Sequence, residues 1–512
     1  MFDTRGRAFQ GGEAEIVPPP RKAKSVPLDA PNLTELMTAG GDERIVLAPE
    51  TRLNRYFSAP SPSAVLAYAS STANDMSPEA FAHVGRLGIG GGLSGEEYRK
   101  ALDRLRGRIR AAYALGAEVD IVFAPSGTDL EYVALACAQG RGAAGTHNIL
   151  LGADEIGSGC IHSARGRYFA GATGLGTATR PGDPVPGLGD TQIDVTDVPV
   201  RDAQGLVRPS AEVARAVDDA AAAARAQERH VLLHVVHGSK TGLVLPSLDD
   251  VDRLRAAHGD RMTIVVDACQ ARINTSAIGA YLDRGAIVLL TGSKFMGGPP
   301  FSGFALVPPR FRSEAPPLPP GLGTIFRRGE WPEGWPGAER LPGGANPGLL
   351  LRLEAAIFEL ERVKRLPVEE IRRIVFAFHR GVRTEIVDAS PARRVPPYPP
   401  GESETAENHP IAMRTLSTLD LTAFAVGGAS IDDATRWHAA LVRHGVRLGQ
   451  PVKCVKLPDG RWGATLRIGL SMPLISARGG LSEEALARSF ADDMARIRAA
   501  LVAVTAQPAG GQ

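Results

Sequence analysis

Two residues near the middle of the chain carry the strongest chemical signal in the sequence. Asp267 directly follows the apolar run Met262 to Val266, and Lys294 follows a second apolar run, Ala286 to Leu290. A lysine amine can hold the aldehyde of pyridoxal phosphate as an imine, and a carboxylate can hold the proton on its ring nitrogen. The two residues together therefore predict a pyridoxal-phosphate site in which both are catalytic.

The place of this pair in the sequence supports the prediction. Continuous apolar runs are typical of buried parallel strands, and open α/β sheets bind ligands just beyond the C-terminal ends of such strands. Each residue also has an ordinary explanation, because an Asp after a strand often caps a helix and most lysines are solvated. The presence of both residues after apolar runs favours the cofactor site.

A phosphate-binding turn is predicted upstream of the pair. Ser126, Gly127 and Thr128 follow the apolar run IVFA and open a predicted helix, so their N–H groups and hydroxyls lie at a helix N-terminus. Such a terminus binds phosphate, although Ser and Thr are also ordinary helix caps.

Four more polar residues are expected to contact the cofactor. Ser239, in the segment HGSKTGLVLPS, is expected to reach its phenolic oxygen, and Gln270 to reach the same oxygen or the imine. Thr291 and Ser293 flank the lysine and are expected near the phosphate. Turns and helix starts use the same residue types, so each of the four also has a purely structural interpretation.

Arg467 is the candidate for binding a substrate carboxylate. It lies in the predicted strand within ATLRIGLSMPL, and a guanidinium can form a bidentate pair with a carboxylate. A surface arginine on an edge strand is the alternative interpretation.

The elements that position these residues alternate between helical and strand patterns. Such alternation predicts an α/β domain with a mainly parallel sheet and helices on both faces. The predicted strands are 119–124, 148–151, 192–195, 230–236, 262–266, 286–290 and 303–307, and the predicted helices include 96–115, 210–228 and 248–257. A Pro- and Gly-rich loop at 308–345 is expected to be functional.

Four regions follow from these patterns. Residues 1–45 are predicted to form a flexible arm and residues 46–345 the large cofactor-binding domain. Residues 346–505 are predicted to form connecting helices and a small α+β domain, and residues 506–512 a disordered tail. The small domain is expected to contain strands at 412–426 and 464–470 and helices at 432–444 and 482–504.

The composition excludes several classes of partner. The 512 residues carry 58 basic and 56 acidic side chains, so the net charge of +2 predicts no binding to nucleic acid or to an anionic membrane. The four cysteines are scattered, so we expect no disulfide framework. No apolar stretch has the position or the length of a signal peptide or a membrane span, so neither is expected. We expect a cytoplasmic protein with a small-molecule amino substrate and no metal ion.

These segments together resemble the fold-type I pyridoxal-phosphate enzymes, and most closely the superfamily of class V aminotransferases and cysteine desulfurases. The similar segments are VDACQA, GSKFMGGPPFSG, SGTDLEYVAL, KTGLVLP and LRIGLS, spread from about residue 66 to residue 501. The resemblance implies a large domain with a mainly parallel sheet of the seven-stranded type, a small C-terminal α+β domain, and a homodimer. It also implies the roles given above to Asp267, Gln270, Lys294 and Arg467.

Several departures from the family pattern bear on the reaction. The loop GADEIGSGC lacks the ring that family members stack on the cofactor, and His162 is a candidate replacement. Desulfurases of this superfamily have a nucleophilic cysteine at the position that Val452 occupies here, and Cys454 lies two positions later. Near LPGGANPG, a Gly occupies the place of the family's phosphate-contacting Thr.

The sequence therefore predicts a pyridoxal-phosphate-dependent enzyme that acts on an amino acid or a related amine. An aminotransferase is favoured over a C–S lyase or a cysteine desulfurase-like enzyme, because Cys454 is displaced and no second thiol motif supports sulfur transfer. A non-catalytic regulatory protein with this fold is a third interpretation. The missing ring supports that interpretation, and the retained Asp267, Lys294 and Arg467 oppose it.

Overall fold

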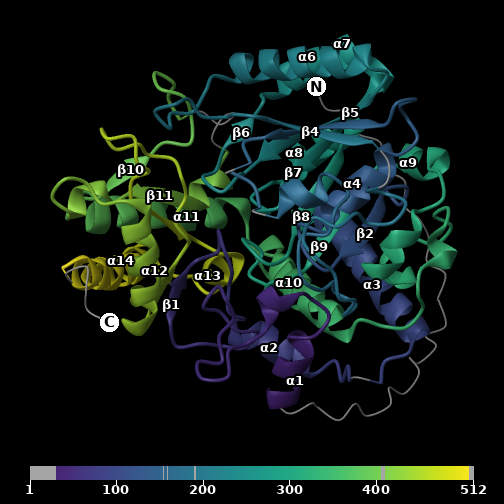
Figure 1. The fold of residues 1–512 in the computed structure, drawn as a ribbon. Helices are drawn as coiled ribbons and strands as arrows, with labels where there is room; N and C mark the ends of the chain where they lie inside the picture. Colours follow the sequence, from purple (N-terminus) through teal and green to yellow (C-terminus); the bar gives the residue numbers. More distant parts are fainter. Residues whose placement is uncertain are drawn as a thin grey trace, which may run out of the picture.

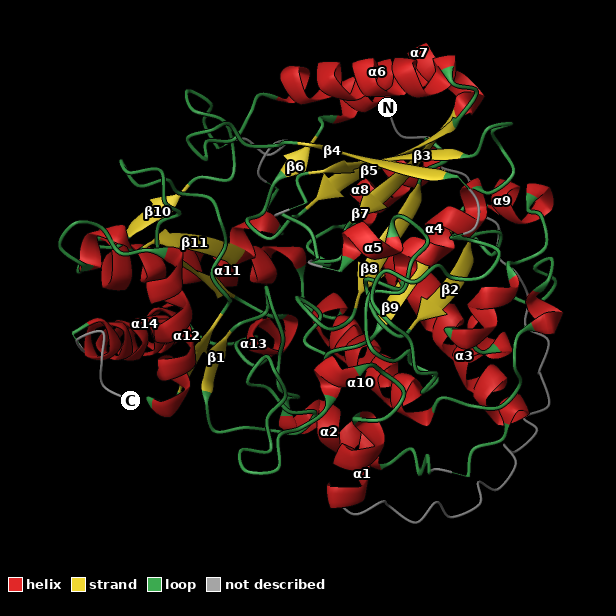
Figure 2. Ribbon diagram, viewed as in Figure 1, coloured by secondary structure: helices red, strands yellow, loops and turns green. Residues whose placement is uncertain are grey.

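The large sheet occupies the centre of the computed structural model, which describes residues 30–90, 92–153, 155–157, 159–189, 192–404 and 410–506. Its strand order is β2-β9-β8-β7-β5-β3-β4, and the short strand β6 pairs with β5 as an eighth strand (Figures 1 and 2). The neighbours β8, β7, β5, β3 and β4 are parallel, whereas β9 runs antiparallel to both β2 and β8. The predicted mainly parallel sheet is therefore confirmed.

The strands of this sheet agree with the apolar runs of the sequence. They are β2 (Asp120–Ala124), β3 (Thr146–Leu151), β4 (Ile193–Val198), β5 (His230–His237), β6 (Val244–Leu245), β7 (Met262–Asp267), β8 (Ile287–Thr291) and β9 (Gly303–Val307). In β7 and β8, successive apolar side chains alternate between two apolar clusters, one on each face of the sheet. Both faces are buried, which explains why the runs are continuously apolar.

Helices and one irregular segment cover the two faces. One face packs against α3 (Gly95–Tyr113), α6 (Ser210–Ala226), α7 (Leu248–His258), α8 (Thr275–Asp283) and α10 (Pro347–Lys364). The other face packs against α4 (Leu130–Ala138) and against residues 311–341, where Trp331 and Trp335 are buried. The Pro-rich segment that the sequence predicts as a functional loop is thus largely a cover for the sheet.

A smaller unit lies beside the large sheet (Figure 2). Its antiparallel sheet consists of β10 (Arg393–Val395), β11 (Leu416–Asp420) and β13 (Thr465–Gly469). The helices α11 (Val368–Val382), α12 (Ile431–Arg443) and α14 (Glu483–Thr505) pack around it, and β1 (Leu66–Tyr68) pairs in parallel with β12 (Val446–Leu448). The predicted strand 412–426 is shorter than expected, because short 3-10 helices, Met413–Thr415 and Thr422–Phe424, flank β11.

The N-terminal region differs from the predicted flexible arm. Residues 30–45 include α1 (Ala30–Met37) and the 3-10 helix Glu43–Ile45, and Leu33 and Met37 are buried in a cluster with α10. Apolar burial therefore orders this part of the predicted arm. Residues 1–29, and residues 507–512 of the predicted tail, lie outside the described residues.

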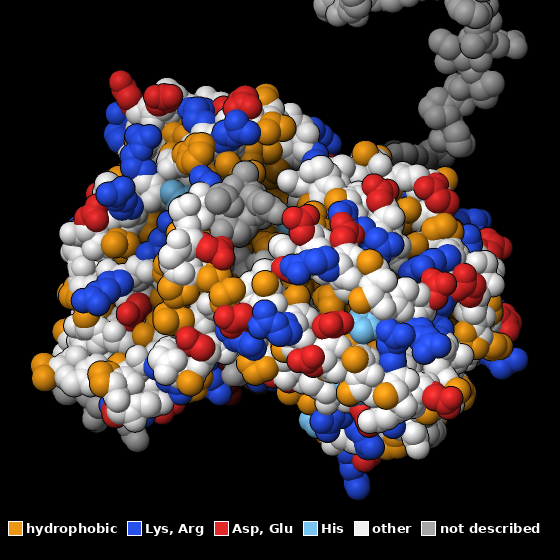
Figure 3. All heavy atoms as spheres, turned by 90° about the horizontal axis from the view of Figure 1, so that it is seen from above, with side chains coloured by type: hydrophobic (Ala, Val, Ile, Leu, Met, Phe, Trp, Pro, Cys, Tyr) orange, Lys and Arg blue, Asp and Glu red, His pale blue; other side chains and the backbone are white. Residues whose placement is uncertain are grey.

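The surface carries both charge signs. On the face in Figure 3, Lys and Arg side chains are interspersed with Asp and Glu side chains. Among the described helices, none is both long and apolar enough to cross a membrane.

Candidate active site

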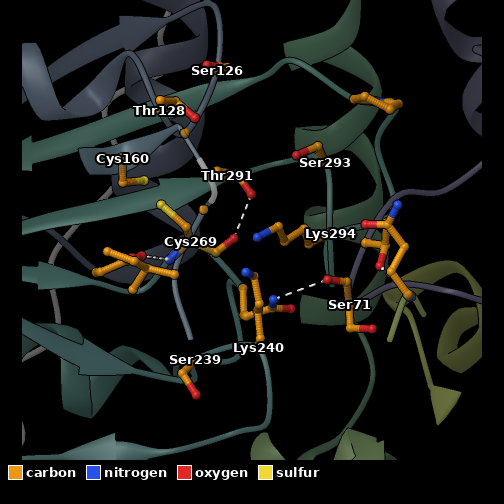
Figure 4. Close-up of a pocket in the computed structure, with 18 of the residues that line it drawn as sticks. Ser71, Ser126, Thr128, Cys160, Ser239, Lys240, Cys269, Thr291, Ser293 and Lys294 are labelled. Atoms are coloured by element: carbon orange, nitrogen blue, oxygen red, sulfur yellow. Dashed lines mark hydrogen bonds between the residues drawn. The ribbon is translucent and has the colours of Figure 1, made fainter. Parts of the chain in front are cut away.

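A pocket of about 280 Å³ opens where β5, β7 and β8 end, and side chains from both units line it. Ten residues selected from the sequence lie together in this pocket: Ser126, Gly127, Thr128, Ser239, Asp267, Gln270, Thr291, Ser293, Lys294 and Arg467. Figure 4 shows Ser126 and Thr128 at one end of the pocket, Ser239 at the other, and Lys294 projecting between them.

Lys294 lies on a tightly held turn after β8. The Asn74 side chain donates hydrogen bonds to the carbonyls of Ser293 (3.1 Å) and Lys294 (2.6 Å), which fixes the backbone. A Cβ atom on Gly292 would overlap Ala356, so this turn requires glycine. Burial lowers the pKa of the Lys294 amine, so more of it is the neutral nucleophile that imine formation requires.

Asp267 ends β7, and its carboxylate accepts a hydrogen bond of 3.0 Å from the N–H of Cys269. A buried acid–base pair lies close by, in which Glu131 Oε2 and His234 Nε2 are 3.3 Å apart. Burial and the charge of Asp267 raise the pKa of Glu131, and burial lowers the pKa of His234 to about 4. Burial thus disfavours the charged form of both Glu131 and His234.

The turn at Ser126 to Thr128 has the features of a phosphate site. Within the described part of the chain, the N–H groups of Gly127 and Thr128 have no acceptor, and they precede α4. A Cβ atom on Gly127 would lie 2.8 Å from the Thr291 methyl group, so only glycine allows this close approach. Unpaired N–H groups at a helix start fit a phosphate group. The Ser126 hydroxyl itself donates to Asp129 at 2.6 Å.

Other predicted contact residues have partners within the protein. The Ser239 hydroxyl donates to Glu155 (2.7 Å), and the Thr291 hydroxyl donates to the Cys269 carbonyl (2.6 Å). The Gln270 amide donates to the Ser71 carbonyl at 3.2 Å, while its oxygen accepts from Arg272 at 2.7 Å. These side chains line the pocket, but their hydrogen bonds also fix the pocket wall, and their contacts to a cofactor stay predictions.

Arg467 reaches the pocket from β13 and lies opposite Gly449 in a β-bridge. Among the described residues it makes four hydrogen bonds: Nε to the Gln450 carbonyl, Nη1 to the carbonyls of Ser71 and Lys240, and Nη2 to the Thr72 hydroxyl. Since a guanidinium has five N–H groups, one N–H on Nη2 is left. A bidentate pair with a carboxylate requires two N–H groups, so the predicted pair does not fit this arrangement.

Sequence reasoning missed a network around Glu155. The Glu155 carboxylate accepts from Arg201 (2.7 Å), Ser239 (2.7 Å) and Thr241 (2.9 Å), all in or beside the pocket. Glu155 stands in the loop where the family's stacking ring was expected, and its charged partner comes from a distant segment. That departure in GADEIGSGC was the only signal in the sequence.

Two other pocket residues come from the segment assigned to the arm and its continuation. Arg44 and Tyr56 line the pocket. The Arg44 guanidinium pairs with Asp42 at 2.6 Å and lies over the rings of Phe169 and Phe301. Polar composition had suggested no role for this segment.

The structure does not bring His162 or Cys454 into the pocket. His162 is exposed on the short helix α5 (Cys160–Ser163), so it is not the ring-stacking residue. Cys454 is only 4% exposed and does not line the pocket, and burial raises the pKa of its thiol to about 12. Within the described residues, the thiols that line the pocket belong to Cys160 and Cys269.

No known family model matches the sequence, and no curated protein matches it either. The fold does match solved structures. A NifS-like protein aligns with a TM-score of 0.52 at 12% identity, over 85% of this chain and 99% of that one. The cysteine desulfurase CsdA from Escherichia coli aligns with a TM-score of 0.53 at 15% identity, over 86% and 95% of the two chains. The chain thus shares its fold with these two structures, and the α/β architecture that the resemblance implies is confirmed.

Proposed function

We propose that the protein is a pyridoxal-phosphate-dependent enzyme that acts on an amino acid, and that it is an aminotransferase. One observation carries the proposal: a single pocket joins Lys294, Asp267, Arg467 and the N–H groups of Gly127 and Thr128, which have no acceptor among the described residues. These groups fit the aldehyde, the ring nitrogen and the phosphate of the cofactor and the carboxylate of a substrate. When bound, pyridoxal phosphate supplies an electron sink for the bonds at the substrate's α-carbon.

The chain's own residues would then divide the work. Lys294 first holds the cofactor, and its amine, once displaced by the substrate, takes and returns a proton at the α-carbon. Its lowered pKa suits this exchange, because a base works best when its pKa is near the operating pH. Asp267 holds the proton on the ring nitrogen.

Amino transfer is favoured over sulfur chemistry by the place of Cys454. A desulfurase needs a reactive thiol that reaches the substrate, but Cys454 is buried away from the pocket and its pKa is raised. Cys160 and Cys269 do line the pocket, but burial raises the pKa of both thiols, which disfavours the thiolate that acts as nucleophile. A C–S lyase needs no such thiol, so the position of the cysteines does not exclude it. C–S lysis is therefore the alternative reaction that the experiments must distinguish from amino transfer.

The cofactor is tested by reducing the protein with borohydride after addition of pyridoxal phosphate. We expect a visible absorbance band before reduction and a cofactor-modified peptide that contains Lys294 afterwards. Lys294→Ala should lose both, and its turnover of an amino acid should fall by a factor of at least about 10³. Lys100→Met, on the surface of α3, serves as the control and should keep both. A protein that stays colourless with added cofactor would contradict the proposal.

The reaction is tested with a panel of amino acids that includes cysteine and its conjugates. We expect conversion of the cofactor to its amine form, and recovery of the aldehyde form after addition of a keto acid. Release of pyruvate with sulfide or sulfane sulfur would instead identify a lyase or desulfurase.

A further inference from the structure

A second lysine reaches into the same pocket. Lys240 lies in the turn between β5 and β6, and Figure 4 shows it in the part of the pocket that Lys294 also enters. Nothing in the family resemblance assigns it a role. Its neighbours explain how it is held and what it faces.

The backbone of Lys240 is fixed on both sides. Its N–H donates to the Glu155 carbonyl at 2.9 Å, and its carbonyl accepts from Arg467 Nη1 at 3.1 Å. The adjacent Ser239 and Thr241 side chains both donate to the Glu155 carboxylate. These four hydrogen bonds hold the turn rigidly, which positions the Lys240 side chain for binding.

The Glu155 carboxylate is shared among several donors. Arg201 approaches it at 2.7 Å, and both side chains are at least nine-tenths buried, so the negative charge of Glu155 is largely balanced there. Lys240, Lys294 and Arg467, by contrast, all line the pocket, and burial, followed by the charges of Arg467 and Lys294, lowers the pKa of Lys240 to about 8. A cluster of cations of this kind is stabilised by an anion that enters it.

The hydrogen bonds of Arg467 show that a carboxylate bound in the pocket would need a second donor. Four of its five N–H groups are already used by the protein, so Arg467 offers a carboxylate one hydrogen bond. A carboxylate has two oxygens and needs further donors when it leaves water. An ammonium group such as that of Lys240 carries three donors, and Lys240 lines the same pocket as Arg467.

We propose that Lys240 is a substrate-binding residue that shares the substrate's carboxylate with Arg467. This inference rests on the proposed function and names the substrate class: an amino compound with a carboxylate, rather than an uncharged amine. In the wild-type chain, one carboxylate oxygen accepts from Arg467 Nη2 and the carboxylate also accepts from the Lys240 ammonium group. Specificity for an acid therefore comes from two residues on two different units.

The test compares two small oxyamines that react with the cofactor carbonyl in the holoenzyme. Aminooxyacetate carries a carboxylate, whereas methoxyamine does not, and the absorbance of the cofactor reports the reaction of both. In Lys240→Met we expect the apparent affinity for aminooxyacetate to fall roughly ten- to hundredfold, the loss of a charge-assisted hydrogen bond. Reaction with methoxyamine should not change, which also shows that the variant is folded and loaded.

Two further variants make the test specific for the charge at this position. Lys240→Arg should recover most of the affinity for aminooxyacetate, and Lys100→Met, which removes a surface lysine, should behave like the wild type. An equal effect of Lys240→Met on both oxyamines, or no effect on either, would overturn the inference while leaving the proposed function intact. If neither oxyamine changes the absorbance of the wild-type protein, the proposed function fails, and the inference fails with it.

Discussion

The two ends of the pocket are built in different ways. The cofactor end consists of Ser126 to Thr128, Asp267, Gln270 and Thr291 to Lys294, most of them within one βαβ stretch of adjacent parallel strands. The substrate end consists of Ser71, Thr72, Lys240, Gln450 and Arg467, which come from four distant segments. On the proposed function, the cofactor contacts come from local strand ends, whereas the substrate contacts come from both units.

Charge differs between the two ends in the same way. At the cofactor end, the carboxylate of Asp267 lies near the Lys294 amine. At the substrate end, Lys240 and Arg467 line the pocket together, and the buried carboxylate of Glu155 pairs with Arg201. We infer that the cofactor end is built for a partly cationic ring and the substrate end for an anion. Substitutions at the cofactor end should therefore lower mainly kcat, and substitutions at the substrate end mainly the affinity for aminooxyacetate.

The largest difference between the two ends is expected from Asp267→Asn. The amide keeps the size of the side chain and can still accept the Cys269 N–H, but it loses the charge that holds a proton on the ring nitrogen. We expect kcat to fall by a factor of about 10² to 10³, with the free energy of unfolding and the affinity for aminooxyacetate little changed. Stopped-flow absorbance and urea unfolding measure these quantities. Asp283→Asn, outside the pocket, is the control, and equal losses in both variants would break the comparison.

A smaller effect on rate, but a larger one on stability, is expected from Glu155→Gln. The amide leaves the buried Arg201 without its counter-charge, and loss of one partner of such a pair costs about 3 kcal/mol. The turn that carries Lys240 should also loosen, so that affinity for aminooxyacetate falls while reaction with methoxyamine does not. Urea unfolding and oxyamine titration check both points.

Glu96→Gln provides the matched control for that stability change. Glu96 pairs with Arg99 and Lys100 on the exposed surface of α3, where solvent screens the charges. We expect unfolding to change little in this variant. If Glu155→Gln were as stable as Glu96→Gln, the Glu155 network would not hold the substrate end.

The smallest effect is a pH dependence of carboxylate binding. Burial, followed by the charges of Arg467 and Lys294, lowers the pKa of Lys240 to about 8. The ammonium form predominates below that pH, so binding of aminooxyacetate should be strong at pH 7 and weaken about tenfold by pH 9. Protonation of Lys294 affects the reaction of both oxyamines, so its contribution cancels in the ratio of their affinities. In Lys240→Arg the ratio should stay nearly constant, because a guanidinium keeps its charge; a constant ratio in the wild type would exclude Lys240 from carboxylate binding.

Much of the cofactor end could be predicted from the sequence. The runs that became β7 and β8 are apolar without interruption because both faces of the sheet are buried, and their ends locate Asp267 and Lys294 directly. Gly127 could be chosen because it lies in a Ser-Gly-Thr turn before a predicted helix, where backbone N–H groups can bind a phosphate. All of these signals are short-range, and they survive in a single sequence.

The substrate end was only partly predicted. Arg467 was chosen by its place in LRIGLS, but its four internal hydrogen bonds depend on carbonyls contributed by residues 71, 240 and 450. Lys240 was present in the segment HGSKTG without being selected, because a lysine in a turn is normally solvated. Arg44 and Tyr56 lay in or just after a segment that polar composition assigned to a flexible arm, although burial of Leu33 and Met37 orders its second half.

By itself, the sequence determined the alternation of helices and strands, the parallel sheet and the residues at its strand ends, because side-chain periodicity records burial locally. Only the tertiary structure decided which distant loops meet across the pocket, which donors of Arg467 are already used, and that Cys454 and His162 lie outside it. Those outcomes depend on chain crossovers and on packing between units, and neither leaves a pattern within a short stretch of sequence.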